Sequence, residues 1–163
     1  MAARTRLDIE RPVFTTYISL ITIHREPMPI QALLDAARIG DLKVLEVLIQ
    51  NGTDLEARDD DDSTALILAA ESGHPACLKL LIDAKADIKA CDLLNKTALI
   101  VAVSHGNLAC ARLLVDANVD VRAMDATGNT ALMIAARKGH RDCVQLLLDA
   151  NADIEVSMRV VGS

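Results

Sequence analysis

The first residues in the sequence that could do chemistry are four consecutive aspartates, Asp59 to Asp62. Carboxylates at alternate positions, closed by a later glutamate, bind calcium in EF-hand loops, and a loop of this kind could run from Asp60 toward Glu71. The glycine that such a loop needs at its turn is replaced by Ala65, and residues 64–71 read as a helix. The sequence therefore predicts a solvated acidic loop with no metal site.

The four histidines are His24, His74, His105 and His140. His74 and His140 each follow a glycine directly, whereas His105 precedes one, and this regularity favours structural roles. No two histidines have metal-ligand spacing with a third partner. The sequence also lacks a glycine-rich phosphate loop and a serine nucleophile elbow. We therefore expect neither catalysis nor a cofactor.

Three of the four cysteines, Cys77, Cys110 and Cys143, are spaced 33 residues apart in apolar surroundings. Equivalent positions on stacked helices lie about 8–10 Å apart, beyond the roughly 7 Å that a disulfide can bridge between Cα atoms. We predict three buried free thiols, with Cys91 exposed on a loop. Such thiols are typical of a reducing, intracellular setting, either cytoplasmic or nuclear.

The same interval of 33 residues organises most of the chain. Thr-Ala-Leu begins at Thr64, Thr97 and Thr130. Four glycines keep the same spacing, and these are Gly40, Gly73, Gly106 and Gly139. Each unit contains two short apolar stretches with helical spacing, and helices of about 10 residues are not stable alone in water. The pattern predicts a stack of repeats in which each unit is held by its neighbours.

These recurring positions resemble the ankyrin repeat over about four fifths of the chain. The resemblance implies an all-α solenoid of stacked helix-turn-helix units with β-hairpin-like finger loops. The family's Thr-Pro-Leu-His lacks its proline and histidine here. Lys85 stands where a glycine is usual, and a lysine in the left-handed conformation carries a strain cost.

The expected organisation is an N-terminal extension over residues 1–25 and a repeat domain over residues 26–163. Its repeats span about 26–58, 59–91, 92–124 and 125–157, followed by a partial tail.

The β-branched segment Val13–Ile23 is too short to span a membrane. It is a signal-peptide core, an extended cover for the open face of the first repeat, or a disordered stretch. No polar capping unit follows Ile154, so the chain is a fragment or its last apolar edge is covered by the tail or by another chain.

Composition narrows the partner classes. Apolar residues make up 52% of the chain and aromatic residues 1%, so the core must consist of Ala, Leu, Ile and Val. The net charge is −6, and residues 59–91 contain seven acidic and three basic side chains. Non-specific nucleic-acid binding needs clustered Lys and Arg, and is therefore not expected.

The resemblance implies that a partner docks on the concave side, formed by the finger tips and the outer positions of each first helix. Transferred to this sequence, those positions are Arg58, Asp60, Asp61, Ser63, Glu71, Cys91, Leu93, Leu94, Lys96, His105, Met124, Asn129, Arg137 and Lys138. Leu93 and Leu94 are unusual, because finger tips favour polar and turn residues. Either one of them folds over its own unit, or the pair is an apolar anchor with acid on one side and base on the other.

The resemblance predicts a protein–protein interaction module that acts as an adaptor, scaffold or regulatory subunit and is monomeric on its own. A protein partner is expected, without nucleic acid or membrane. Two alternatives remain. The chain could be the targeting or regulatory segment of a larger enzyme, such as a kinase or a ubiquitin ligase, or it could be a structural spacer.

Overall fold

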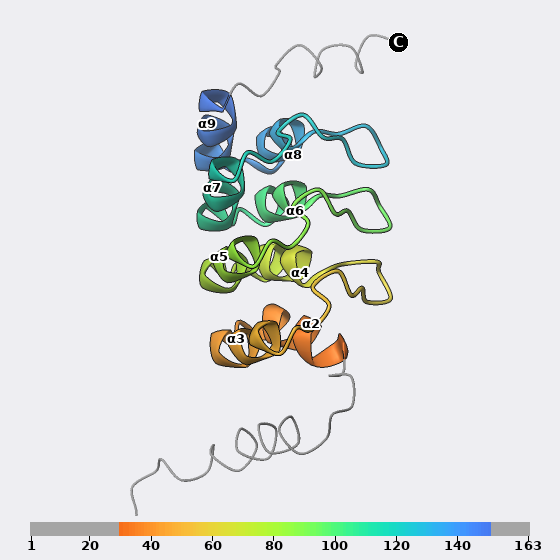
Figure 1. Ribbon diagram of the computed structural model, residues 1–163. Coiled ribbons are helices and arrows are strands. Elements are labelled where there is room, and N and C mark those ends of the chain that lie inside the picture. The colour runs from red at the N-terminus through yellow and green to blue at the C-terminus, as the bar shows by residue number, and fades with distance from the viewer. Residues whose placement is uncertain (1–29, 151–163) are drawn as a thin grey trace, which may run out of the picture.

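The computed structural model describes residues 30–150. The predictions for residues 1–25, and for the chain after Ala150, lie outside the described residues. The described chain forms eight helices, named as in Figure 1, with these bounds: α2 Ile30–Ile39, α3 Leu42–Gln50, α4 Ala65–Ser72, α5 Pro75–Asp83, α6 Ala98–Ser104, α7 Leu108–Asp116, α8 Ala131–Lys138 and α9 Arg141–Asp149.

The helices form four antiparallel pairs that stack in chain order (Figure 1). The first helices of the units, α2, α4, α6 and α8, pack against one another in sequence, and the second helices, α3, α5, α7 and α9, form a parallel row. Loops between the pairs project on the side opposite the second helices. The predicted solenoid of helix-turn-helix units is confirmed.

The recurring threonine directly precedes α4, α6 and α8, and a left-handed glycine directly follows α2, α4 and α8. The hydroxyl of Thr97 accepts a hydrogen bond from the backbone N–H of Ile100 at the start of α6, and this satisfies a donor that the helix itself cannot. At the other end of α4, Gly73 has a φ of 75°, a left-handed conformation that ends a helix at little steric cost. Pro75 then occupies the first turn of α5, as predicted.

Each loop is a finger closed by an isolated antiparallel bridge. The bridges join Arg58 to Thr64, Cys91 to Thr97, and Met124 to Thr130. Hairpin-like fingers are therefore confirmed. The predicted strain position is also found, because Lys85 has a φ of 69° just after α5.

Neighbouring units are also joined by the residue that follows the turn glycine. The imidazole of His74 lies against Gly40, where an added Cβ would come within 2.7 Å of Nδ1. Its Nε2 is 3.1 Å from the carbonyl oxygen of Arg38. Asn107, at the same position one unit later, donates from Nδ2 to the carbonyl oxygen of Ala70 over 2.9 Å. His74 therefore has a structural role.

The core is continuous through the stack and is built from small and aliphatic side chains. Leu48, Leu81 and Leu114, one per unit, are fully buried. Ala69 and Ala70 of α4 are also fully buried, and their small size lets adjacent first helices approach closely. This packing fixes where each finger and each first helix presents its outer residues.

Candidate functional site

The three finger tips are each shaped by one aspartate. The Oδ1 atom of Asp59 accepts hydrogen bonds from the backbone N–H groups of Asp61 and Ser63, over 3.0 and 2.9 Å. Asp92 and Asp125 make the same two contacts with the residues two and four positions later. Side chains of this type replace the backbone partner in a turn, so the tips have a defined conformation.

Asp125 shows the electrostatic effect of this arrangement. Partial burial of its carboxyl works to raise the pKa, but hydrogen bonds from the Thr127 hydroxyl and from the backbone and side chain of Asn129 outweigh it. The net pKa of Asp125 is therefore lowered. The donors favour the charged form because they point at the carboxylate oxygens.

Adjacent fingers are joined at their tips by backbone hydrogen bonds. The N–H of Leu93 donates to the carbonyl oxygen of Asp61 over 3.1 Å, and the N–H of Ala126 donates to the carbonyl oxygen of Leu94 over 2.8 Å. The guanidinium of Arg58 also donates to the carbonyl oxygen of Cys91 over 2.8 Å. The tip that contains the two leucines is therefore held from both sides.

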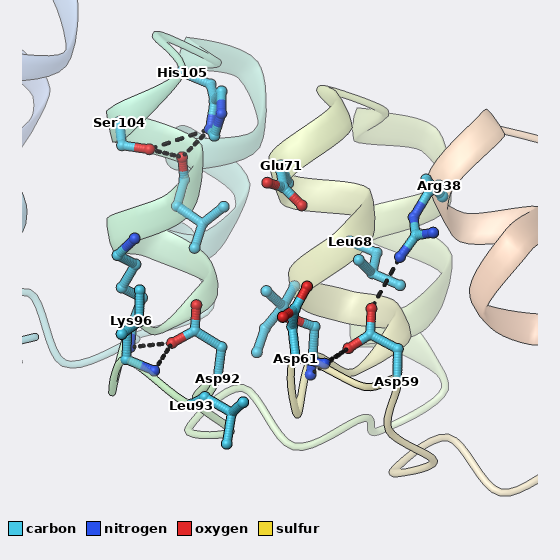
Figure 2. Close-up of a pocket in the computed structure, with 14 residues that line it drawn as sticks. Arg38, Asp59, Asp61, Leu68, Glu71, Asp92, Leu93, Lys96, Ser104 and His105 are labelled. Atoms are coloured by element: carbon cyan, nitrogen blue, oxygen red, sulfur yellow. Dashed lines mark hydrogen bonds and ion pairs between the residues drawn. The ribbon is translucent and has the colours of Figure 1, made fainter. Parts of the chain in front are cut away.

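A groove of about 250 Å³ lies between the second and third units, bounded by α4, α6 and their fingers (Figure 2). Its walls carry Asp61 and Glu71 from the second unit, and Leu93 and Lys96 from the third (Figure 2). The complete lining is Arg38, Asp59, Asp61, Ser63, Ile67, Leu68, Glu71, Asp92, Leu93, Leu94, Lys96, Val101, Ser104 and His105.

A second cavity, of about 530 Å³, adjoins the groove on the side of the first unit. The two cavities share Arg38, Asp59 and Asp61, so they meet at the second finger. The second cavity adds Asp60 and Arg58 to the charged residues around that finger.

The charges around the second finger are only partly paired. The guanidinium of Arg38 contacts Asp59 Oδ2 over 2.9 Å (Figure 2), and that of Arg58 contacts Asp62 Oδ2 over 2.9 Å. Among residues 30–150, the ion pairs do not include Asp60, Asp61 or Glu71, which are the other carboxylates of this unit that line the two cavities. They place three negative charges at the two cavities, whose lining also includes Asp92 and Lys96.

Two of the four consecutive aspartates have structural roles. Asp59 shapes the finger tip, and Asp62 takes the left-handed turn position with a φ of 61° while pairing with Arg58. In the described part of the chain, no group of three or more His, Cys, Asp or Glu side chains is placed to hold a metal ion.

The structure groups half of the predicted partner-binding residues in the groove. Those in the groove are Asp61, Ser63, Glu71, Leu93, Leu94, Lys96 and His105. Arg58 and Asp60 line the adjoining cavity. Outside both cavities lie Cys91, Met124, Asn129, Arg137 and Lys138.

The two basic residues of α8 are engaged within the chain. The ammonium of Lys138 donates to the carbonyl oxygen of Ser104 over 2.8 Å, and Arg137 donates to the side-chain oxygen of Asn129 over 3.4 Å. The basic end of the predicted surface is therefore less available than its acidic end.

Three of the predictions change in detail. Leu93 and Leu94 are 66% and 55% exposed, so the alternative in which one of them folds over its own unit is wrong. Cys91, which forms the bridge to Thr97, is half-buried rather than exposed. Ser63 is only 6% exposed and offers little surface to a partner.

Sequence reasoning missed Arg38, Asp59 and Asp92 as residues of the groove. Arg38 occupies the position of Glu71 one repeat earlier, so extending the first-helix rule to the first unit would have found it. The spacing of 33 residues between Asp59 and Asp92 was the available signal for the finger aspartates.

The predicted burial of the three repeated cysteines is confirmed. Cys77, Cys110 and Cys143 are each 1% exposed, and all four cysteines are free thiols. Burial raises the pKa of Cys110 to about 11. It also raises the pKa of Cys77 and Cys143, with added repulsion from Asp41 and from Asp142 respectively.

A family model described as ankyrin repeats, with three copies, matches residues 33–125 and 84–158. No curated protein matches the chain. Within residues 30–150, no helix is both long and apolar enough to cross a membrane. Because the two family matches span most of the sequence and the stacked helix pairs agree with them, the chain belongs to the ankyrin-repeat family.

Proposed function

We propose that this protein binds a partner protein through its finger–helix face, the surface formed by the finger tips and by α4, α6 and α8. In this proposal it acts as an adaptor, scaffold or regulatory subunit and performs no catalysis. Ankyrin repeats are generally protein–protein interaction modules, which supports the general statement. The contacts at the centre of the finger–helix face support the choice of this surface.

The observation that carries the proposal is the exposed apolar tip of the third finger. Leu93 and Leu94 are the two most exposed leucines at the groove, and burial of apolar surface is the dominant favourable term in most protein–protein association. Their backbone is fixed by hydrogen bonds to Asp61 and Ala126. A partner that covers this tip would pay little conformational entropy, because the tip is already ordered.

The charge around the tip favours a protein partner over nucleic acid. The net charge of the chain is −6, and the carboxylates of Asp60, Asp61 and Glu71 face the groove and its neighbouring cavity. Phosphate backbones would be repelled from this face. A protein segment can offer basic side chains to these carboxylates and apolar side chains to Leu93 and Leu94.

The test is affinity capture with mass spectrometry from cells that express the protein, with cross-linking to report the residues in contact. The variant is Leu93→Ser with Leu94→Ser. The matched control is Ile39→Ser, because Ile39 is 70% exposed, also apolar, and lines neither cavity.

The variant should lose the partner that the wild type and the control both retain, and cross-links should fall on the third finger. Equal capture by all three proteins would contradict this proposal. Circular dichroism of each variant should show an unchanged helical fold, since both leucines project into solvent.

A further inference from the structure

We infer that the segment bound in the groove is an extended stretch of a partner protein in which an arginine or lysine stands close to a large apolar residue. This inference rests on the proposed function and adds the chemical identity of the bound segment. It follows from which charges are already satisfied within the chain and which are not.

The acidic wall of the groove lacks internal counter-charges. Arg38 is paired with Asp59 over 2.9 Å, so its charge is already neutralised locally. Asp92 directs Oδ1 at two backbone N–H groups, each over 2.8 Å. Asp61 and Glu71 are left without an ion pair among the described residues, and both lie on the second-unit wall (Figure 2).

A cation from the partner is the group that completes this wall. The side chains of Asp61 and Glu71 are exposed, but both line the same groove. Their two negative charges therefore add in attracting a basic side chain, and salt screens that attraction. Arginine suits the site best, since its planar guanidinium can contact two carboxylates at once.

The wall opposite is apolar at its tip. Leu93 lies at the edge of the groove on the third finger, beside the tip that contains Asp61 (Figure 2), and Leu94 lines the same space. Ile67 and Leu68 of α4 lie beneath and are nearly fully buried. An aliphatic or aromatic side chain placed on Leu93 and Leu94 would therefore be sheltered from water next to the bound cation.

The arrangement of the two cavities favours an extended segment. They meet at the second finger, where they share Arg38, Asp59 and Asp61. Beyond that finger, Asp60 lines the neighbouring cavity, and it also has no ion pair among the described residues. An extended chain turns successive side chains to opposite sides at about 3.3 Å per residue, so it can follow both cavities and present a basic and an apolar residue to this face.

The basic end of the face does not offset this preference. Lys138 and Arg137 already donate to Ser104 and Asn129. An acidic group of the partner would have to replace those contacts or pair with Lys96, the one cation of the groove lining outside the ion pairs of residues 30–150, whereas a basic group finds both Asp61 and Glu71 without an ion pair there. Recognition should accordingly be biased toward cationic segments.

The experiment is selection of a phage-displayed library of random dodecapeptides on the immobilised full chain, followed by affinity measurements on synthetic fluorescent peptides. The charge variant is Asp60→Asn, Asp61→Asn, Glu71→Gln. The matched control is Glu46→Gln, Asp116→Asn, Asp142→Asn, which removes the same number of charges of the same type from exposed positions on α3, α7 and α9.

Peptides selected on the wild type should be enriched in Arg or Lys within one or two residues of a large apolar residue. The charge variant should bind them about tenfold or more weakly, while the control stays within about twofold of the wild type. On the charge variant, a fresh selection should keep the apolar residue and lose the basic one.

The outcomes separate this inference from the proposed function. Loss of binding in Leu93→Ser with Leu94→Ser, together with unchanged binding in the charge variant, would overturn the basic segment and leave the protein-binding surface in place. Insensitivity to both variants would overturn both. Self-association in sedimentation that the charge variant abolishes would assign the groove to a second copy of the chain, and would also overturn the inference.

Discussion

The backbone N–H of Leu93 donates a hydrogen bond to the carbonyl oxygen of Asp61 over 3.1 Å, across the boundary between the second and third repeats. The contact fixes an apolar tip directly beside an acidic one. All fingers share the repeat pattern, so that pattern predicts neither the acidic residues of the second tip nor the apolar residues of the third. Among the three described fingers, only this pair places an acidic tip beside an apolar one.

The packed core should respond to truncation as a continuous hydrophobic interior does. Leu81→Ala and Leu114→Ala should each lower the free energy of unfolding by about 2–5 kcal/mol, because both leucines are fully buried. Leu93→Ala is the control and should change it by about 0.5 kcal/mol or less. Urea denaturation followed by circular dichroism measures all three. Equal losses would mean that the burial pattern is wrong.

The lysine in the left-handed turn should be replaceable with a gain in stability. Lys85 has a φ of 69°, and Lys85→Gly should raise the free energy of unfolding by about 0.5–1 kcal/mol after the entropy of glycine is subtracted. Asn118 occupies the same position one unit later with a φ of 59°. Asn118→Gly should change stability less, because asparagine tolerates this conformation. A larger gain at Asn118 in thermal unfolding would contradict this explanation.

The thiols should separate into one accessible and three protected groups. Cys91 is half-buried at the finger, whereas Cys77, Cys110 and Cys143 are 1% exposed. At mildly alkaline pH, a maleimide should modify Cys91 first and the others only on unfolding, and the pKa of Cys110, about 11, slows its reaction further. Peptide mass spectrometry after timed quenching measures the order. Equal rates at all four cysteines would contradict it.

Stability should depend on the ionisation of Asp125. Its pKa is lowered in the folded protein, so its contribution is present above the unfolded value of about 3.9 and is lost as the pH falls through the folded pKa. The stability difference between wild type and Asp125→Asn should therefore be larger near neutral pH than in strong acid. Urea denaturation at both pH values measures it, and an NMR titration of the carboxyl gives the pKa directly. A stability difference that is larger in strong acid than near neutral pH would mean that folding raises the pKa of Asp125 rather than lowering it.

The repeated part of the fold could be predicted from the sequence because the same residues that start and end helices recur from unit to unit. Thr97 starts a helix, Gly73 ends one and Pro75 begins the next, and all three do so in the structure. These signals act within a few residues, so their periodicity is visible in the sequence.

The details of the groove could not be predicted in the same way, because they depend on contacts between units. The pairing of Arg38 with Asp59 and the bond from Lys138 to Ser104 join residues 21 and 34 positions apart. Which charges remain unpaired is decided by such contacts and not by composition. The backbone of Leu93 is likewise held by the neighbouring finger, through its hydrogen bond to Asp61.

The central claim is that Leu93 and Leu94 anchor the partner while Asp60 and Asp61 attract it. It is tested most directly by surface plasmon resonance at low and high salt, with a peptide selected on the wild type. Leu93→Ser with Leu94→Ser should mostly speed dissociation at both salt concentrations. Asp60→Lys with Asp61→Lys should mostly slow association, less so at about 1 M salt, where the Debye length falls to about 3 Å. A leucine variant that dissociates at the wild-type rate would contradict the account.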